Sequence, residues 1–449
     1  MSKSPEAPSW ASSERTIPRR VVRPLREFLD TEAAGGLVLL AATVIALLWA
    51  NSPWSASYEA LWSTRLGVRL GRFGFSADLL HWVNEGAMTL FFFVVGLEIK
   101  RELVSGEMAG LRRAALPVAG AVGGMALPAL IYAGFNLGGE GAVGWGIPMA
   151  TDIAFAVGAL TLVAPRAPTT LRVFLLTLAI VDDIGSIAII ALFYSQGLSP
   201  VALAAAATLL VVIATMKVLR MWWVPVYAFL GTAFWFSVLL SGVNATIAGV
   251  VLGLMTPAHA LDPSSMRRWH LTPGRSVLEP RPSEVRPAAQ RMHESVPVAE
   301  RLEYVLHPWS GYLVIPLFAL ANAGLAVDGS LLGDALASPV GLGVLVARVA
   351  GKLVGIVVAV WIAVRLGAAP LSSDVRLREI VGAAALCGVG FTVPLFVTGL
   401  AFDSRPQLAA IATLSLLLAS VVAAALGATI LRWKSSAPPP AGSANAAGH

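Results

Sequence analysis

The chain has 449 residues, of which 57% are hydrophobic and 13% are charged. A soluble fold of this length cannot bury so much apolar surface, so the composition indicates an integral membrane protein. Although the formal net charge is +6, the basic residues are scattered among apolar runs, which argues against a nucleic-acid partner. The single cysteine, Cys387, excludes an intrachain disulfide.

Twelve apolar stretches of about 20 residues, the length that crosses a bilayer as a helix, follow one another along the chain. They begin near residues 33, 79, 114, 141, 170, 200, 224, 242, 308, 339, 377 and 407. The sequence therefore predicts an all-α polytopic membrane protein with twelve transmembrane helices. The first run is too long for a cleaved signal and follows about 32 polar and basic residues, so we expect it to remain as a span.

An even number of spans places both termini on one side of the membrane. Most of the 32 Lys and Arg residues fall on that side, and short cytoplasmic segments retain basic residues, so both termini are predicted to be cytoplasmic. We expect one twelve-helix transporter domain. Its predicted segments are a basic, partly disordered N-terminus over 1–32, the domain over 33–434 with a polar cytoplasmic loop at about 259–302, and a disordered tail over 435–449.

One segment outside the spans has the pattern of a strand pair. The stretch "TRLGVRLGRFGFS", residues 64–76, alternates roughly between apolar and other residues and contains several glycines. It is consistent with a small β ribbon outside the membrane or with a plain loop.

Among the charged side chains inside predicted spans, four are candidates for a function: Asp152, Asp182, Asp183 and Lys352. A charge at the bilayer centre costs about 2.5–3.5 kcal/mol on insertion scales, so such residues usually face a cavity and serve a function. Asp182 is about 18 Å into its helix, near the midplane. A structural salt bridge is the alternative for one Asp and one Lys, but it does not account for three acids beside one such base.

Asp182 and Asp183 are adjacent, so on a helix their side chains point about 100° apart. They cannot both face Lys352; one can pair with the lysine while the other faces a water-filled crevice. Burial and a neighbouring like charge make a carboxylate harder to ionise, so it can hold a proton or a small cation but not both. Hard oxygen ligands favour alkali or alkaline-earth ions. The pair is therefore predicted to be a site of competition between protons and a cation, with no cofactor.

Two predicted spans are interrupted by helix-breaking residues. The breaks fall at Pro148 and Thr151 in one span and at Gly388, Gly390 and Pro394 in the other. Broken helices expose amide and carbonyl ends, so we expect Asp152 to offset the positive ends and Lys352 the negative ones. Such interruptions are typical of transport sites between inverted repeats, although glycines can also simply allow close helix packing. The Thr151 hydroxyl is predicted to be an ion ligand or a helix cap.

Acidic residues also lie near the ends of the second span. Glu85 is toward the outer end, and Glu98 is near the cytoplasmic end with Glu102 four residues later on the same face. Such a group can form an acidic funnel that attracts cations, or an interfacial cluster of salt bridges with Lys100 and Arg101.

Several motifs in order resemble those of the NhaA family of bacterial sodium/proton antiporters. They are "PLREFLDTEAAGGLVLL", "VGLEIKREL", "GIPMATDIAFAVGAL", "LAIVDDIGSIAIIALFY", "SGVNATIAGV", "LEYVLHPWSGYLVIPLFALANAG" and "CGVGFTVPLF". The resemblance covers residues 23–434 and is highly specific. The rule that interrupted helices mark transport sites was drawn partly from this family, so it is not independent support.

The resemblance implies a fold and an activity. The fold has two inverted-topology repeats, with the fourth and eleventh helices discontinuous and crossing at the midplane. The activity is electrogenic exchange of two protons inward for one sodium or lithium outward, in the bacterial inner membrane, for pH and sodium homeostasis. The ribbon near residue 70 would then be the contact of a homodimer.

Roles for individual residues also follow from the resemblance. Asp182 and Asp183 match the pair that binds the ion and carries protons, with Asp182 the partner of Lys352. Asp152, beside Thr151, matches the acid of the broken fourth helix. Glu98 matches the funnel glutamate, and Glu303 falls in the region that the family associates with pH sensing.

Two positions depart from the family pattern. Asn244 stands where well-known members have a histidine implicated in the pH response, and Asn does not titrate. Arg348, one turn before Lys352, fits no motif of the family; it is either a packing residue or a like charge that acts on Lys352.

Two other classes of function use buried acids. An intramembrane aspartyl protease needs two catalytic Asp residues on separate helices, which only Asp152 with Asp182 offers here, and the Gly-x-Gly-Asp motif typical of such enzymes is missing. A sodium-coupled organic-anion symporter of related architecture is the other alternative. We predict a transporter and not an enzyme.

Overall fold

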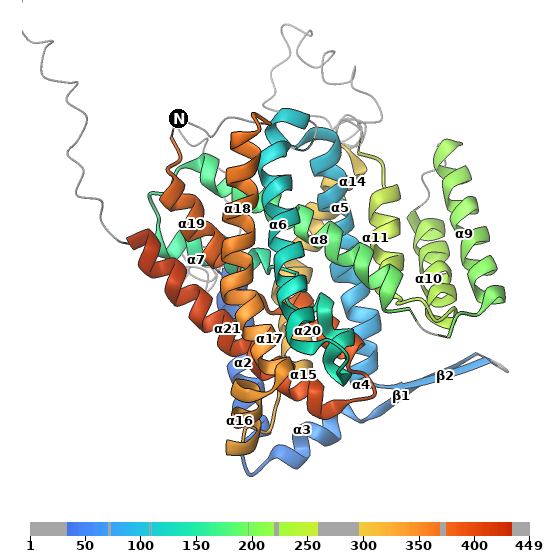
Figure 1. The fold of residues 1–449 in the computed structure, drawn as a ribbon. Helices are drawn as coiled ribbons and strands as arrows, with labels where there is room; N and C mark the ends of the chain where they lie inside the picture. The colour runs from blue at the N-terminus through green and yellow to red at the C-terminus, as the bar shows by residue number, and fades with distance from the viewer. Residues whose placement is uncertain are drawn as a thin grey trace, which may run out of the picture.

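A computed structural model describes most of the chain as helices (Figure 1). The described residues are 34–70, 73–106, 108, 110–195, 197–219, 224–258, 296–368 and 374–432. The N-terminus and tail predicted to be disordered, and most of the predicted polar loop, lie outside them.

The elements are named in chain order, with η marking a 3₁₀ segment (η5) or a π-helical segment (η3, η6 and η7). They are α2 (Ala34–Ala50), α3 (Ser55–Trp62), β1 (Arg65–Leu70), β2 (Phe73–Asp78), α4 (Leu79–His81), η3 (Trp82–Ala87), α5 (Met88–Ser105), α6 (Leu111–Asn136), η5 (Glu140–Gly146), α7 (Ile153–Val163), α8 (Thr169–Phe193), α9 (Pro200–Val218), α10 (Val224–Leu240), α11 (Thr246–Met255), α14 (Val298–Trp309), η6 (Ser310–Val314), α15 (Ile315–Asn322), α16 (Gly329–Ala337), α17 (Pro339–Val346), η7 (Ala347–Gly351), α18 (Lys352–Arg365), α19 (Leu377–Leu386), α20 (Thr392–Ala401) and α21 (Pro406–Arg432).

The prediction of an all-α membrane protein with several spans is confirmed. Within the described residues, six helical segments are long and apolar enough to cross a bilayer, and α2 with α3, bent by 115°, makes up to seven. Other predicted spans contain shorter apolar helices such as α7, α11 and α20. The count of twelve transmembrane helices stays a prediction.

The helix predicted to begin near residue 308 begins earlier, at Val298, directly after Pro297. The polar connection therefore ends a few residues before the expected boundary. Proline is favourable just before a helix and costly inside one, yet Pro308 lies within α14. The π-helical turn η6 follows it at once, the kind of local adjustment that accommodates an internal proline.

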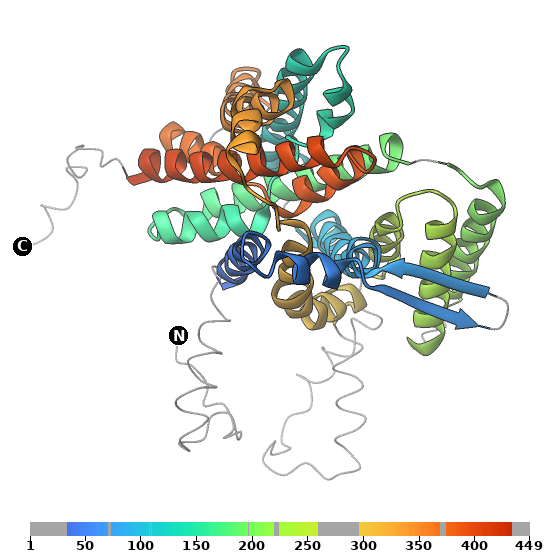
Figure 2. The same ribbon diagram turned by 90° about the horizontal axis from the view of Figure 1, so that it is seen from below.

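The predicted β ribbon is present. Strands β1 and β2 pair antiparallel, with Arg65 opposite Asp78 and Leu70 opposite Phe73. The hairpin extends away from the helices, toward the side where α9 and α10 lie (Figures 1 and 2).

Glycines allow the central helices to pack closely. Helices α6 and α18 meet at Gly123 and Gly355, where an added methyl group would collide with the backbone of the facing helix. Helices α5 and α11 meet in the same way at Gly96 and Gly253. Small residues at such interfaces bring backbones together in membranes, where no hydrophobic force drives helices to associate.

Both predicted interruptions are present. The first lies at residues 147–152, between η5 and α7, and the second lies at residues 387–391, between α19 and α20. The two breaks lie side by side, because the backbone N–H of Asp152 donates to the carbonyl of Val389 at 3.3 Å. Pro394 was expected within the second break but lies in the first turn of α20, where its missing N–H has no helical partner to lose.

Candidate functional site

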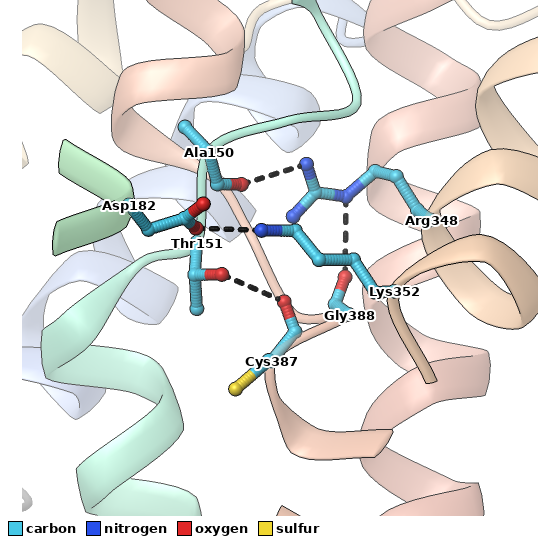
Figure 3. Close-up of polar contacts among 7 residues, drawn as sticks. All are labelled: Ala150, Thr151, Asp182, Arg348, Lys352, Cys387 and Gly388. Carbon is cyan, nitrogen blue, oxygen red and sulfur yellow. Dashed lines mark hydrogen bonds and ion pairs between the residues drawn. The ribbon is translucent and has the colours of Figure 1, made fainter. Parts of the chain in front are cut away.

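A buried ion pair lies where the breaks meet. Lys352 Nζ, at the start of α18, is 2.5 Å from Asp182 Oδ2 on α8, and both side chains have no solvent exposure. Figure 3 shows the lysine reaching toward Asp182 beside the first break. The prediction that only one of the two adjacent acids would pair with Lys352 is therefore confirmed in geometry, and Asp182 is that acid.

The neighbouring acid has a different environment. Asp183 is also buried, at 4% exposure, and its Oδ1 atom has no hydrogen-bond partner among the described residues. The same is true of Asp182 Oδ1 and of the Ser186 hydroxyl. Ser186 lies three residues after Asp183 and four residues after Asp182, so its side chain is a neighbour of both acids on the surface of α8. Buried oxygens without donors carry a cost, which a bound cation or proton would relieve.

Ser186 was not singled out from the sequence. A serine in a helix usually donates to the carbonyl four residues earlier, as Ser237 does to Ala233 in α10, so the identity of Ser186 alone carried no signal. Among the described residues, no three Asp, Glu, His or Cys side chains converge to hold a metal ion. A cation at Asp183 would therefore need hydroxyl, carbonyl or water oxygens as further ligands.

Asp152 joins the amino-terminal ends of the two helices that leave the breaks. It caps α7 by accepting from the N–H of Phe155 at 3.3 Å. Its other oxygen accepts from the N–H and the hydroxyl of Thr392, at the start of α20, at 3.1 and 2.7 Å. The expectation that Asp152 offsets positive helix ends agrees with this geometry.

The carbonyl groups exposed at the breaks are compensated by a residue other than Lys352, the one expected. Arg348, in η7, donates to the carbonyl of Ala150 at 3.0 Å and to that of Gly388 at 3.1 Å. These carbonyls belong to the two breaks (Figure 3). The expectation that Lys352 would fill this place is corrected: its ammonium bonds to Asp182 instead, and the planar fork of guanidinium donors suits two carbonyls at once.

Thr151 was predicted to be an ion ligand or a helix cap. Its hydroxyl donates to the carbonyl of Cys387 at 3.1 Å, which adds a further contact between the breaks, and its role as an ion ligand or cap stays a prediction. Glu85 and Asn244 form hydrogen bonds at the start of α11, away from the place where the two breaks meet. Glu85 accepts from the N–H of Ala245 at 3.1 Å, and Asn244 accepts from that of Thr246 at 3.1 Å.

Glu98 and Glu303 belong to a second polar cluster, between α5 and α14. Arg101 bonds to Glu303, and His307 Nε2 is 4.0 Å from Glu98 Oε1. Beside it is an open depression of about 410 Å³, lined by Arg101, Glu300, Glu303, Tyr304, His307 and Pro308. His307 was not singled out from the sequence, although its place four residues after Glu303 puts both on one helix face.

The chain is similar to known sodium/proton antiporters over most of its length. The family model described as Na⁺/H⁺ antiporter 1 matches residues 26–431. The chain belongs to the Na⁺/H⁺ antiporter 1 family. The matched range includes both breaks and every site residue named above.

Among its relatives is the Na⁺/H⁺ antiporter NhaA 3 of Frankia alni, 47% identical over 92% of this chain and 89% of the relative. The NhaA of an Anaeromyxobacter species is 45% identical over 92% of each chain. The NhaA 2 of Sorangium cellulosum is 43% identical over 94% of this chain and 93% of the relative. The resemblance to the NhaA family inferred from the motifs is thus confirmed.

The bond between Asp152 and Thr392 gives a first prediction. Replacing Thr392 by Val keeps the side-chain shape but removes the hydroxyl that reaches Asp152, so the detergent-purified protein should lose about 1–3 kcal/mol of stability. The readout is thermal unfolding followed by tryptophan fluorescence. Thr398→Val is the control, because the Thr398 hydroxyl bonds only within α20, to Pro394. Equal melting temperatures for both variants would show that the Thr392 hydroxyl contributes no stability through its bond to Asp152.

Proposed function

We propose that this chain is a secondary active transporter that extrudes sodium across the bacterial inner membrane in exchange for protons. Membership of the Na⁺/H⁺ antiporter 1 family supports the activity. The observation that supports the site is the buried Lys352–Asp182 pair with Asp183 directly beside it. The Oδ1 atoms of Asp182 and Asp183, which have no hydrogen-bond partner among the described residues, are carboxylate oxygens for a cation.

The geometry supports a cycle of competition. In the proton-loaded state Asp183 is protonated and Lys352 bonds to Asp182. When sodium enters, two protons leave to the same side, one from Asp183 and one from the Lys352–Asp182 pair, so that Lys352 is released and sodium takes the Asp183 and Asp182 carboxylates. Two protons from the other side then displace sodium and restore the pair. A carboxylate in a low-dielectric site cannot keep both partners, because each neutralises the same charge.

The finer properties belong to the same proposal. Exchange of two protons for one sodium moves net charge, so transport is electrogenic, and lithium, a smaller hard cation, uses the same oxygens. Ion gradients supply the driving force, and no cofactor takes part. The physiological role is then pH and sodium homeostasis.

The test uses proteoliposomes that hold a pH-sensitive dye. A sodium or lithium pulse should change the internal pH, whereas potassium or choline should not. If exchange is electrogenic, clamping the membrane potential with valinomycin and potassium should speed it. Sodium uptake that requires an organic anion and moves no protons would favour the symporter. Cleavage of a model transmembrane peptide without cation dependence would favour the protease.

We further propose that the cluster of Arg101, Glu303, His307 and Glu98 senses pH at the cytoplasmic mouth. Replacing Glu303 by Gln breaks its ion pair with Arg101 and should move the pH at which exchange is half-maximal while the maximal rate is kept. Glu300→Gln is the matched control, since Glu300 lines the same depression. Equal profiles for the two variants would refute a special role for Glu303.

The orientation and assembly are also proposals. Both termini are cytoplasmic, so a protease added outside right-side-out vesicles should leave a C-terminal tag intact. The β1–β2 hairpin is the homodimer contact, so deletion of residues 65–78 should give a monomer in light scattering. Lipids surround the exposed apolar helices such as α9.

A further inference from the structure

Arg348 is the largest fully buried side chain among the described residues, and its bonds are unusual for a buried charge. Both of its bonding partners are uncharged carbonyls, those of Ala150 and Gly388. Its remaining terminal nitrogen, Nη2, has no hydrogen-bond partner among the described residues. The guanidinium therefore neutralises no acid through a direct bond. It connects the break before α7 with the break before α20.

The two buried cations of this helix thus have separate partners. Lys352 bonds to Asp182, a group that the proposed function requires to exchange ligands. Arg348 bonds to backbone groups that never change charge. A guanidinium also stays protonated in proteins. The carbonyl ends of both breaks therefore stay compensated whether or not Lys352 is bonded to Asp182.

The surrounding backbone fits Arg348 closely. It lies in the π-helical turn η7, where the N–H of Lys352 bonds to the carbonyl of Ala347, five residues earlier. Such turns often occur at functional sites. Gly390 lies directly against the guanidinium, and an added methyl group there would overlap with Nη2. A side chain at residue 390 would therefore push the guanidinium out of place.

We propose that Arg348 is a positioning residue for exchange: by joining the carbonyls of Ala150 and Gly388, it holds the two breaks in register so that Asp182 and Asp183 keep their geometry when Lys352 is released. The inference rests on the proposed function and deepens it. Asp152 joins the amino-terminal ends of the two helices that follow the breaks, and Arg348 joins carbonyls within the breaks themselves. Removal of Arg348 should therefore loosen the cation site without removing any of its carboxylates.

The first test compares sodium KM values in proteoliposomes with equal amounts of folded protein. Arg348→Met should raise the sodium KM about tenfold or more, the scale of loss expected from misplaced groups. Arg348→Lys should also raise the sodium KM, because an ammonium keeps the charge but lacks the planar fork of donors that holds both carbonyls. Arg365→Met is the control; Arg365 is exposed at the far end of α18, against Trp361. A purely structural role would reduce the yield of folded protein and leave KM unchanged.

The second test displaces the Arg348 guanidinium by changing a neighbouring residue, and it applies even if Arg348→Met does not fold. Gly390→Ala should raise the sodium KM by displacing the guanidinium, whereas Gly399→Ala, on the same segment with open space around it, should not. In a protein that already carries Arg348→Lys, Gly390→Ala should raise the sodium KM by a smaller factor than it does in the unaltered protein, because both changes act on one contact.

The outcomes separate the two proposals. If the unaltered protein exchanges sodium and Arg348→Lys or Gly390→Ala keeps a KM within about twofold of it, a difference within ordinary mutational scatter, the role of Arg348 is overturned. Fully additive effects of the two changes would also overturn it. If the unaltered protein exchanges no sodium for protons, the proposed function itself fails.

Discussion

Asp183→Asn is expected to abolish sodium-driven proton movement while the protein stays folded. The amide keeps the shape of the side chain but neither ionises nor neutralises a cation. The Lys352–Asp182 pair is untouched by the change, and a buried carboxylate that costs free energy is removed. Stability should therefore equal or exceed that of the unaltered protein. The measurements are dye fluorescence in proteoliposomes and thermal unfolding in detergent.

Asp182→Asn provides the informative comparison. It should also abolish exchange, but it leaves Lys352 buried without its anionic partner, so the melting temperature should fall. Asp334→Asn is the control for the chemical change, because Asp334 is exposed on α16. Exchange at the normal rate in either variant of the pair would show that the site is assigned to the wrong residues.

Lys352→Ala is expected to destabilise the protein more than any other substitution proposed where the two breaks meet. It leaves Asp182 buried without a cation at bonding distance, and breaking a buried pair from one side costs about 3–5 kcal/mol. Both side chains have no solvent exposure, so water cannot compensate the lost partner. Thermal and denaturant unfolding of the purified protein measure the loss.

The double variant Lys352→Met with Asp182→Asn separates stability from transport. Replacing both members of a buried ion pair by neutral groups is often neutral or stabilising, so most of the lost stability should return. Exchange should not return, because the Asp182 carboxylate is gone. A double variant less stable than Lys352→Ala would show that the pair is not the source of the effect.

Much of the site follows from two simple properties of membrane helices. The cost of charge in a membrane identifies Asp152, Asp182, Asp183 and Lys352, and the 100° step between neighbours predicts that one adjacent acid alone pairs with the lysine. Which acid pairs depends on how α8 is rotated toward α18, and this is a tertiary property that periodicity does not contain. The family resemblance supplied that choice.

Arg348 shows what the sequence could not decide. A buried arginine one turn before a buried lysine is consistent with packing, with repulsion or with bonding to distant groups. Its actual partners, Ala150 and Gly388, are carbonyls, and a carbonyl has no signature in the residue type. Gly390 was an indirect signal, since a glycine beside a break leaves room for a neighbouring side chain, but it did not identify that neighbour.

The spans were predicted by length and apolar composition, and the simplest of them, such as α8 and α21, are long apolar helices as expected. The shorter helices were harder to delimit. α14 carries polar residues in its first turns, which hid its start at Val298. Mean hydropathy over a window of residues cannot distinguish a polar loop from the polar first turns of a helix.

The sharpest test of the competition mechanism is isothermal titration calorimetry of sodium or lithium into the detergent-purified protein at two pH values. Each titration would be run in buffers with different ionisation enthalpies. If protons and sodium compete for the carboxylates of Asp182 and Asp183, sodium binding will release protons into the buffer. The affinity for sodium will then decrease as the pH falls. Equal affinity at both pH values with no proton release would contradict the mechanism.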